Sequence, residues 1–332
     1  MADISIIIPA YNAEGTLSRA VQSISEKENI EIIIVENGST DGTLKLAEAM
    51  MKDDDRIRVI QSEKGVSRAR NTGIAAASGK WILFLDADDA YTEDAFEVMA
   101  GYLDTDADIV EFGHYHGTKP VPVTKIDKSF FDDADDAKVM MIEKPTVYLT
   151  ALSRLFRRDI IIDNGLTFDV EMSISEDSDF VMRYLLLCKR IVFSKEIIYR
   201  YSVDNESTMR SYDPERVKKY LSALYKTAGH IRNEALFIRK AFGRYVLQNV
   251  NIMMVHGPFS ADSPEPFKTK VRIMKSVAKT ELVKASLRQL GLKDLKNMRL
   301  IPLFMLKCKM YLLAGAVYAI RAHHNQRLVK ER

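Results

Sequence analysis

Short apolar runs alternate with amphipathic helical patterns from residue 4 to about residue 115. The strand-like runs are 4–8, 31–35, 57–60 and 81–85, and the helix-like segments between them are 17–24, 44–50 and 66–77. Runs this rich in apolar residues indicate strands buried on both faces, which is typical of a parallel sheet covered by helices on either side. We therefore predict a doubly wound, mostly parallel α/β domain in the first half of the chain.

Proline, glycine and polar residues mark the predicted ends of these elements. We expect Pro9 to end the first strand and Gly79 to cap the helix that precedes it. Acidic residues crowd the segment 132–136, which we predict to be a loop. His114 and His116 follow a predicted strand, and we expect them in an exposed loop; contact with a ligand is the alternative.

The second half of the chain is less regular and becomes helical toward the C-terminus. Strand-like runs continue to residue 200, and after Pro214 apolar residues recur at helical spacing. The segment 260–266, rich in Ser and Pro, is the clearest linker. We therefore divide the chain into an α/β domain at 1–210 and a C-terminal helical appendage at 211–332.

The composition is that of a globular protein. Of 332 residues, 47 % are hydrophobic and 28 % charged, which excludes disorder, collagen and coiled coil as the main state. Cys188 and Cys308 are too few for a disulfide framework or a cysteine-based zinc site. No basic stretch precedes the first apolar run, so we expect no secretory signal and a cytoplasmic location.

Charge divides the chain into two unlike halves. Residues 1–141 have a net charge of −13 and residues 142–332 a net charge of +15, although the whole chain has only +2. An acidic first half argues against nucleic acid as a partner unless a divalent cation intervenes. The basic second half suits phosphates or anionic lipid, and the alternative is two solvated surfaces of opposite sign.

Polar and acidic residues follow the predicted strands, at the edge where a doubly wound sheet binds ligands. The segment 9–12 follows the first strand, 36–41 the second, and 86–89 the last. Asp86 and Asp88 lie on the same side of an extended chain, and their mutual repulsion favours a cation between them. Such oxygen ligands suit Mg²⁺ or Mn²⁺ together with a substrate phosphate. The alternative is an acidic turn that caps the following helix.

Two common nucleotide-binding motifs are absent from the sequence. No Gly-x-Gly-x-x-Gly follows the first strand, and no Gly-x-x-x-x-Gly-Lys-Ser/Thr occurs. A phosphate ligand would then be held through a metal and through cations such as Arg68 and Arg70. The alternative for both arginines is a solvated helix face.

Five segments combine these features in a fixed order. They are Ile6–Asn12, Val35–Thr43, Gly65–Gly73, Phe84–Asp89 and Ser175–Phe180. In order and spacing, the first four resemble the nucleotide-binding half of glycosyltransferase family 2, and the fifth is similar to that family's Glu-Asp motif. The resemblance covers residues 3–210. It implies the A-type glycosyltransferase fold, a nucleotide-sugar donor and a divalent metal, Mn²⁺ or Mg²⁺.

The resemblance also implies roles for individual residues of the donor site. Pro9 and Tyr11 would line the nucleobase pocket, and Glu36 would contact uracil and ribose. Arg70 would lie beside the nucleotide, and Asp88 would bind the metal that bridges the diphosphate. Asp86 would lie near the ribose and, with Asp88, is a candidate metal ligand. The whole nucleotide-sugar-binding set is Pro9, Ala10, Tyr11, Glu36, Arg70, Asp86, Ala87 and Asp88.

Two positions depart from the family pattern. Glu36 and Asn37 stand where the family usually has two aspartates, which weakens the inference of uridine specificity. Glu63 stands where an asparagine is frequent, two residues before Gly65, so that one nucleotide contact is lost or replaced.

The Glu-Asp motif would supply the chemistry. By the resemblance, Asp177 would be the catalytic base and Glu176 would lie beside it. A sugar on a nucleoside diphosphate already has a good leaving group, so one carboxylate that takes the proton of the attacking hydroxyl is enough. Single displacement then inverts the anomeric centre. The alternative is that both residues only complement the dipole of a helix N-terminus.

These features together predict an inverting, metal-dependent glycosyltransferase. It would move one sugar from a UDP-sugar to a glycan or lipid-linked acceptor hydroxyl, in surface-polysaccharide biosynthesis. No Gln-x-x-Arg-Trp segment, a motif of the family's processive synthases, occurs in the sequence, which favours transfer of a single sugar. A sugar nucleotidyltransferase, which would have a Gly-rich loop with a basic residue after the first strand, and a non-catalytic glycan-binding protein are the alternatives.

The C-terminal tail combines positive charge with an apolar run. Residues 293–332 contain nine Lys or Arg and two acidic residues, and Met310–Ile320 is an uncharged run of 11 residues. This run is too short to span a bilayer, but basic residues beside an apolar stretch are typical of a helix that lies on an anionic leaflet. We expect peripheral attachment to the cytoplasmic face of the membrane; the alternative is a helix packed on the catalytic domain.

Overall fold

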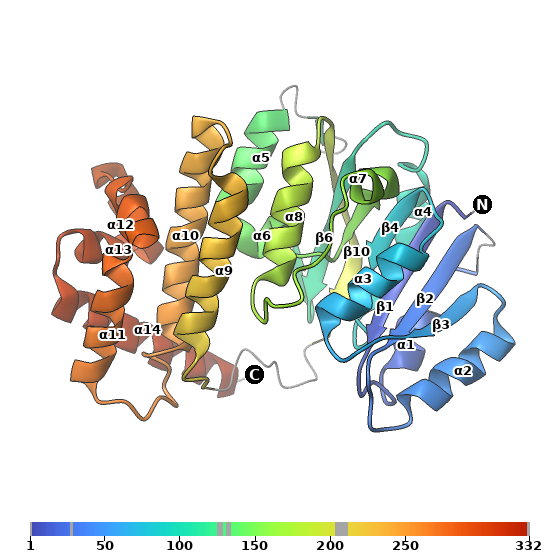
Figure 1. Cartoon of the computed structure of the whole chain (residues 1–332), viewed down its shortest axis with the longest axis horizontal. Coiled ribbons are helices and arrows are strands. Elements are labelled where there is room, and N and C mark those ends of the chain that lie inside the picture. The colour runs from blue at the N-terminus through green and yellow to red at the C-terminus, as the bar shows by residue number, and fades with distance from the viewer. Residues whose placement is uncertain (1, 27–28, 125–128, 131–133, 203–211, 331–332) are drawn as a thin grey trace. The chain divides into compact units, whose positions relative to one another are not determined.

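The computed structural model describes residues 2–26, 29–124, 129–130, 134–202 and 212–330 (Figure 1). Within these ranges the chain divides into two compact units. The first unit takes in the described residues of 1–141, 145–171 and 176–205, and the second those of 142–144, 172–175 and 206–332.

A mixed sheet forms the centre of the first unit, with ten strands in the described part of the chain. Its main path runs in the order β3–β2–β1–β4–β9–β6–β10–β5, while β7 pairs with β6 and β8 with β10. The strands are β1 (Ile4–Ala10), β2 (Ile30–Glu36), β3 (Ile57–Gln61), β4 (Trp81–Phe84), β5 (Ala90–Tyr91), β6 (Ile109–His116), β7 (Lys119–Val121), β8 (Ser129–Phe130), β9 (Arg154–Arg157) and β10 (Ile191–Tyr201).

Parallel pairing accounts for the long ladders of this sheet. β1 pairs with β2 over seven residues, β2 with β3 over five, and β6 runs parallel to β10 along most of its length. β9 is inserted antiparallel between β4 and β6, with ladders of two and three residues. The structure confirms the predicted α/β class with its doubly wound sheet, and it adds short antiparallel strands that the sequence pattern did not predict.

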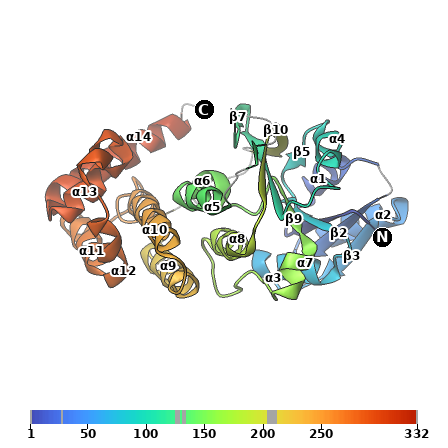
Figure 2. The ribbon, with the colours of Figure 1, turned by 90° about the horizontal axis from the view of Figure 1, so that it is seen from above.

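Helices cover both faces of the sheet, as a doubly wound fold requires. α3, α7 and α8 lie along one face, and α1 and α4 along the other (Figure 2). The helices up to residue 187 are α1 (Leu17–Gln22), α2 (Thr43–Asp53), α3 (Val66–Ala76), α4 (Ala95–Ala100), α5 (Ala134–Glu143), α6 (Pro145–Tyr148), α7 (Arg158–Asp163) and α8 (Glu176–Leu187).

Aromatic side chains pack between β4 and α8. Phe168 stacks on Phe180 with 4.0 Å between the ring centroids, and Phe84 meets both rings edge-on. Trp81 is fully buried in β4, and its indole N–H donates to the Leu103 carbonyl at 3.1 Å. Each buried aromatic side chain contributes roughly 1.5–3 kcal/mol of hydrophobic stabilisation. This cluster therefore fixes the end of β4 next to the first turns of α8.

Two predicted element ends are wrong in detail. β1 does not end at Pro9 but continues through it. Its neighbour β4 pairs only with residues 4–7 of β1, so the N–H that Pro9 lacks costs no hydrogen bond to β4. α3 ends at an extended residue, Ala77, and not at a capping glycine. Gly79 instead permits a close approach of two chain segments, since a Cβ at this position would lie 2.7 Å from the backbone nitrogen of Ser5.

Two expected loops also differ from the structure. Asp135 and Asp136 lie in the first turn of α5, where the helix dipole favours acidic side chains, while residues 132–133 lie outside the described residues. His114 lies inside β6, 9 % exposed, with its ring edge-on to Tyr201. The expectation of an exposed loop at His114 is therefore wrong, because the strand extends further than its apolar run.

The second unit is helical from residue 216 onward, which confirms the predicted helical appendage. Tyr220, Ala223, Leu224 and Ile231 are buried in its first helix, and the segment 260–266 connects two later helices of this same unit. Its helices are α9 (Arg216–Ile231), α10 (Leu236–His256), α11 (Phe267–Lys279), α12 (Glu281–Arg288), the 3₁₀ turns η1 (Leu292–Lys296) and η2 (Met298–Leu300), α13 (Ile301–Lys307) and α14 (Tyr311–Lys330). Among the described residues, no helix has the length and apolar character needed to cross a membrane.

Candidate active site

A cavity of about 550 Å³ opens at the carboxyl ends of the parallel strands. The residues that follow β1, β2, β3 and β4 all contribute to it, because parallel neighbours end at the same edge of a sheet. Its lining consists of Pro9, Tyr11, Asn12, Ala13, Gly15, Thr16, Asn37, Lys64, Gly65, Val66, Asp86, Ala87 and Asp88. Five predicted donor-site residues thus lie together: Pro9, Tyr11, Asp86, Ala87 and Asp88.

Two other predicted donor-site residues lie behind this lining. Ala10 is fully buried in β1. Glu36 is 4 % exposed, and its carboxylate accepts hydrogen bonds from the Ser39 N–H at 2.5 Å and from the Gln61 amide at 3.5 Å. The carboxylate of Glu36 therefore stabilises the turn after β2, whereas the next residue, Asn37, lines the cavity.

One part of the cavity is an aromatic ring with a cation over it. The Nζ of Lys64 lies 4.3 Å from the ring centroid of Tyr11 and donates to the Tyr11 hydroxyl at 2.6 Å. Asn37 donates to the Ala10 carbonyl at 3.2 Å and accepts from the Gly65 N–H at 3.4 Å. Sequence reasoning missed Lys64 and Asn37 as cavity residues. Asn37 directly follows β2 and Lys64 comes three residues after the end of β3, and these positions beyond strand ends were the available signal.

Arg70 of α3 joins the cavity to the Glu-Asp motif. Its side chain is 4 % exposed, and its guanidinium lies 3.1 Å from Asp86 Oδ1, 2.5 Å from Asp177 Oδ1 and 4.0 Å from Glu176 Oε1. Asp86 follows β4, while Glu176 and Asp177 form the start of α8. Two adjacent carboxylates at the start of α8 and one from the distant segment after β4 therefore meet at one buried cation.

Burial and mutual repulsion shift the titration of these groups. Burial alone would lower the pKa of Arg70, but the carboxylates of Asp177, Asp86 and Glu176 outweigh it and raise that pKa. Burial raises the pKa of Asp86, with Arg70 opposing the shift. Burial, followed by repulsion from Asp177, raises the pKa of Glu176 to about 7. Of the two carboxylates in the Glu-Asp motif, Asp177 makes the closer contact with Arg70.

Asp177 is held from two sides. Its Oδ1 accepts from Arg70, and its Oδ2 accepts from the N–H of Ala151 at 3.3 Å. The side chain remains 24 % exposed, so that a substrate hydroxyl can reach it. Its place in the first turn of α8 adds the favourable field of a helix N-terminus. The arrangement fixes the direction of a carboxylate that is open to proton transfer.

A second set of contacts fixes the chain after β4. Arg19 donates to the backbone carbonyl of Asp88 at 2.5 Å, and the Tyr199 hydroxyl donates to Asp89 at 2.7 Å. The Asp86 N–H in turn donates to the Tyr199 oxygen at 3.2 Å. Burial, with Asp86 nearby, raises the pKa of Asp89 to about 7. Asp89 is therefore a buried anchor of this loop, while Asp86 and Asp88 line the cavity.

The two cavity carboxylates suit a metal that binds together with its substrate. Within the described ranges, no group of three or more His, Cys, Asp or Glu side chains is arranged to hold a metal ion. Asp86 and Asp88 offer hard oxygen ligands at the cavity, and Mg²⁺ typically takes one or two protein carboxylates and completes its shell with phosphate and water. These residues therefore fit a divalent cation bound with a diphosphate.

Known proteins share the fold of this chain and the family of its first domain. Residues 5–165 match the model of glycosyl transferase family 2. The uncharacterized glycosyltransferase EpsJ of Bacillus subtilis (strain 168) is 28 % identical to this chain over 320 residues, which cover 92 % of either protein. The crystal structure of Staphylococcus aureus TarS 1–349 in complex with UDP-GlcNAc matches with a TM-score of 0.71 at 18 % identity, covering 98 % of this chain and 92 % of TarS 1–349.

A second solved structure has the same architecture. The mannosyltransferase PcManGT from Pyrobaculum calidifontis, in complex with GDP-Man and Mn²⁺, matches with a TM-score of 0.55 at 15 % identity, covering 96 % of this chain and 87 % of that chain. At such identities the two structures show the fold alone, and they confirm the A-type glycosyltransferase fold. Residues 5–165 thus form a glycosyltransferase family 2 domain, and the protein is a glycosyltransferase.

Proposed function

We propose that this glycosyltransferase is inverting and metal-dependent, and that it transfers a single sugar from a UDP-sugar to a hydroxyl of a glycan or lipid-linked acceptor in surface-polysaccharide biosynthesis. The observation that supports this most directly is the contact of Arg70 with both Asp86 and Asp177. One buried cation thereby links the cavity for the donor to the candidate base. In-line displacement requires the nucleophile to approach opposite the leaving group, and this contact holds the candidate base in a fixed position relative to the cavity.

The cavity suits a nucleoside diphosphate. Its volume of about 550 Å³ falls in the usual range for small-molecule sites. The ring of Tyr11 offers a surface on which a base can stack, and Lys64 offers a cation for an oxygen of the base or the phosphates. The complex of TarS with UDP-GlcNAc supports a uridine donor. Ala10 and Glu36 would contribute indirectly, by stabilising the backbone of the segments that line the cavity.

A divalent cation, Mn²⁺ or Mg²⁺, would bind at Asp88 with Asp86 beside it. When bound, it would offset the negative charge that develops on the leaving diphosphate. The complex of PcManGT with Mn²⁺ supports this choice of cofactor. Arg70 keeps one oxygen of Asp86 directed toward α3, which leaves Asp88 as the main candidate ligand.

Asp177 is the proposed general base, and Glu176 its neighbour. Arg70 and the Ala151 N–H hold its two oxygens, so the carboxylate keeps one orientation as it accepts the proton of the acceptor hydroxyl. The hydroxyl oxygen attacks the anomeric carbon as the bond to the diphosphate breaks, which inverts that carbon. The diphosphate leaves without protonation by a second carboxylic acid, unlike the leaving group in glycoside hydrolysis.

The direct test is release of nucleoside diphosphate. We expect the protein with Mn²⁺ to release UDP from one member of a panel of UDP-sugars, and to release little GDP from GDP-mannose. Removal of the metal with EDTA should abolish the release. Failure to release a nucleoside diphosphate from any nucleotide sugar, with water or with glycan acceptors present, would contradict the proposed function.

Removing the Asp88 carboxylate should weaken nucleotide binding only when metal is present. We expect Asp88→Ala to bind UDP at least about tenfold more weakly than the wild type in Mn²⁺, because the lost ligand holds the diphosphate through the ion. In EDTA the two proteins should bind UDP alike. Asp55→Ala, at an exposed acidic position, is the matched control. Calorimetric titration would measure these affinities, and equal UDP affinity in Mn²⁺ would refute the assignment.

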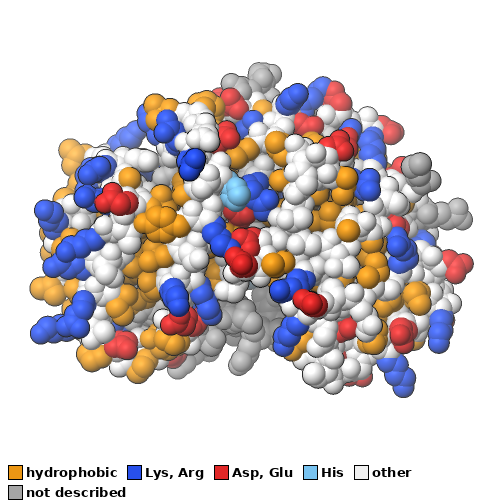
Figure 3. Space-filling model, viewed as in Figure 1, with side chains coloured by type: hydrophobic (Ala, Val, Ile, Leu, Met, Phe, Trp, Pro, Cys, Tyr) orange, Lys and Arg blue, Asp and Glu red, His pale blue; other side chains and the backbone are white. Residues whose placement is uncertain are grey.

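We further propose that residues 1–210 form the catalytic domain and that residues 211–332 associate with the acceptor or the membrane. On the face seen in Figure 3, Lys and Arg side chains surround apolar side chains over α11–α13. Leu292 and Met298 are 78 % and 75 % exposed, and both lie among basic residues. Exposed apolar side chains surrounded by cations suit the surface of an anionic leaflet. Peripheral attachment to the cytoplasmic face would bring a lipid-linked acceptor within reach.

Binding to anionic vesicles tests this attachment. We expect the full chain to co-sediment with phosphatidylglycerol vesicles at low salt and to be released at high salt. Leu292→Ser combined with Met298→Ser should reduce the sedimented fraction several-fold, while Ile162→Ser, at an exposed apolar position of α7, should not. Point substitutions are preferable to truncation, because Tyr318 of α14 is buried and donates to Asn251 at 2.8 Å. Recovery of all three proteins in the supernatant at both salt concentrations would exclude the attachment.

A further inference from the structure

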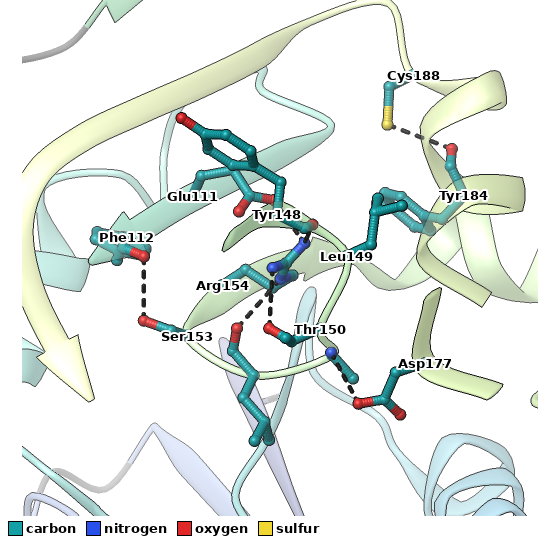
Figure 4. A network of polar contacts seen from close by, with 12 residues as sticks. Glu111, Phe112, Tyr148, Leu149, Thr150, Ser153, Arg154, Asp177, Tyr184 and Cys188 are labelled. Carbon is teal, nitrogen blue, oxygen red and sulfur yellow. Dashed lines mark hydrogen bonds and ion pairs between the residues drawn. The ribbon is translucent and has the colours of Figure 1, made fainter. Parts of the chain in front are cut away.

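A buried ion pair lies next to the chain segment that contacts Asp177 (Figure 4). Glu111 of β6 and Arg154 of β9 are paired in the sheet register, and the Arg154 Nη1 donates to Glu111 Oε1 at 2.8 Å. Their side chains are 0 % and 2 % exposed. The desolvation cost of two buried charges largely cancels their attraction, so stability alone does not explain the pair.

Arg154 directs its other donors at the segment 148–152. Nη1 also donates to the Tyr148 carbonyl at 2.8 Å, Nε donates to the Leu152 carbonyl at 3.2 Å, and Nη2 donates to the Thr150 hydroxyl at 3.4 Å. One planar guanidinium thus holds three oxygens of a five-residue segment. A lysine ammonium would keep the charge but not this fixed, forked geometry.

The same segment contacts the Glu-Asp motif on its other side. The Ala151 N–H donates to Asp177 Oδ2 at 3.3 Å, and the Ser178 hydroxyl donates to the Leu149 carbonyl of the segment at 3.0 Å. Ser153, with a φ of 63°, directly follows the segment, and its hydroxyl donates to a carbonyl of β6 at 2.8 Å. The segment is therefore anchored on the β6–β9 strands and presents one N–H to the carboxylate (Figure 4).

We propose that Arg154, paired with Glu111, is a positioning residue for the base: it fixes the 148–152 segment so that the Ala151 N–H orients the carboxylate of Asp177. The inference rests on the proposed role of Asp177. The second oxygen of Glu111 has no hydrogen-bond partner within the described ranges, so the carboxylate serves to hold the Arg154 guanidinium. Neither member of the pair lines the donor cavity, and loss of the pair should therefore leave donor binding unchanged.

The first test separates turnover from donor binding. We expect Arg154→Lys to lower kcat for UDP release from the UDP-sugar about tenfold, because a small displacement of a catalytic group has a large effect on rate. KM for the UDP-sugar and UDP affinity in Mn²⁺ should stay within about twofold of the wild type. Arg157→Lys, at the other end of β9, is the matched control and should leave kcat unchanged.

The second test asks whether Arg154 acts through Asp177. In an Asp177→Asn background, Arg154→Lys should change kcat by less than about twofold, because the base that it orients is gone. A tenfold loss in both backgrounds would make Arg154 a structural residue only, and unchanged kcat in the single variant would also overturn the proposal.

A third variant keeps the proposal testable should Arg154→Lys fail to fold. Ser178→Ala loosens the same segment from α8 without removing a buried charge, and it should lower kcat about threefold in the wild type but not in Asp177→Asn. Equal effects in the two backgrounds would again overturn the inference. Wild-type protein without UDP release, or Asp177→Asn with wild-type turnover, would instead refute the proposed function and this inference with it.

Discussion

Asp177→Asn is expected to lower the rate of UDP release by about 10²-fold or more, while UDP and metal affinity stay within about twofold. The amide has nearly the same shape as the carboxylate and keeps an oxygen that can accept from Arg70. It cannot take the proton of the acceptor hydroxyl, so only the chemical step is impaired. Steady-state UDP release at saturating donor and Mn²⁺, together with calorimetric UDP titration, measures both quantities.

Neighbouring acidic residues provide the comparison for this variant. Asp163→Asn, at an exposed position of α7, should behave as the wild type. Asp179 is buried and paired with Arg183 at 2.8 Å, which makes it a structural residue of α8. Wild-type turnover in Asp177→Asn would show that another group is the base, and Glu176 and Asp179 would then have to be tested in turn.

Arg70→Met is expected to impair both stability and turnover. Its removal leaves three carboxylates close together without their shared cation, and breaking a buried ion pair in this way costs about 3 kcal/mol. Turnover should fall by about 10²-fold or more, because Asp177 loses the contact that orients it. Calorimetric unfolding would measure the first effect and UDP release the second.

Arg70→Lys separates charge from geometry. The lysine ammonium compensates the negative charge of the carboxylates, so most of the stability should return. It lacks the forked geometry of a guanidinium, however, and cannot hydrogen-bond Asp86 and Asp177 simultaneously. Turnover should therefore stay at least about tenfold below the wild type. If Arg70→Lys had wild-type turnover, the bridge between cavity and base would be unnecessary, and the central support for the proposed mechanism would be lost.

Part of the cavity lining could be predicted because its determinants are local. Asp86, Ala87 and Asp88 follow one apolar run of the sequence, and Pro9 and Tyr11 come directly after another. In a parallel sheet all such segments meet at one edge, so strand identification alone brings them together. The cavity lies at that edge and is lined by all five residues.

Other features depend on information that the local pattern does not contain. Glu36 and Asn37 are adjacent, yet one stabilises the turn and the other lines the cavity, and a one-residue difference in strand end decides between them. The direction of β9 follows from tertiary packing, because four residues have no pattern that distinguishes parallel from antiparallel pairing. The contact of Arg70 with Asp177 joins residues 107 positions apart and requires the folded α3 and α8.

Trp81 is the single tryptophan of the chain, and it is fully buried in β4 of the first unit. Intrinsic indole fluorescence is therefore an optical signal from that unit alone, and it shifts to longer wavelength when the strand becomes hydrated. Far-ultraviolet circular dichroism, in contrast, sums over the helices of both units. Denaturation curves recorded by the two methods on one sample would coincide if the units unfold together and separate if they do not. The protein thus has a built-in, label-free probe for the stability of its first unit.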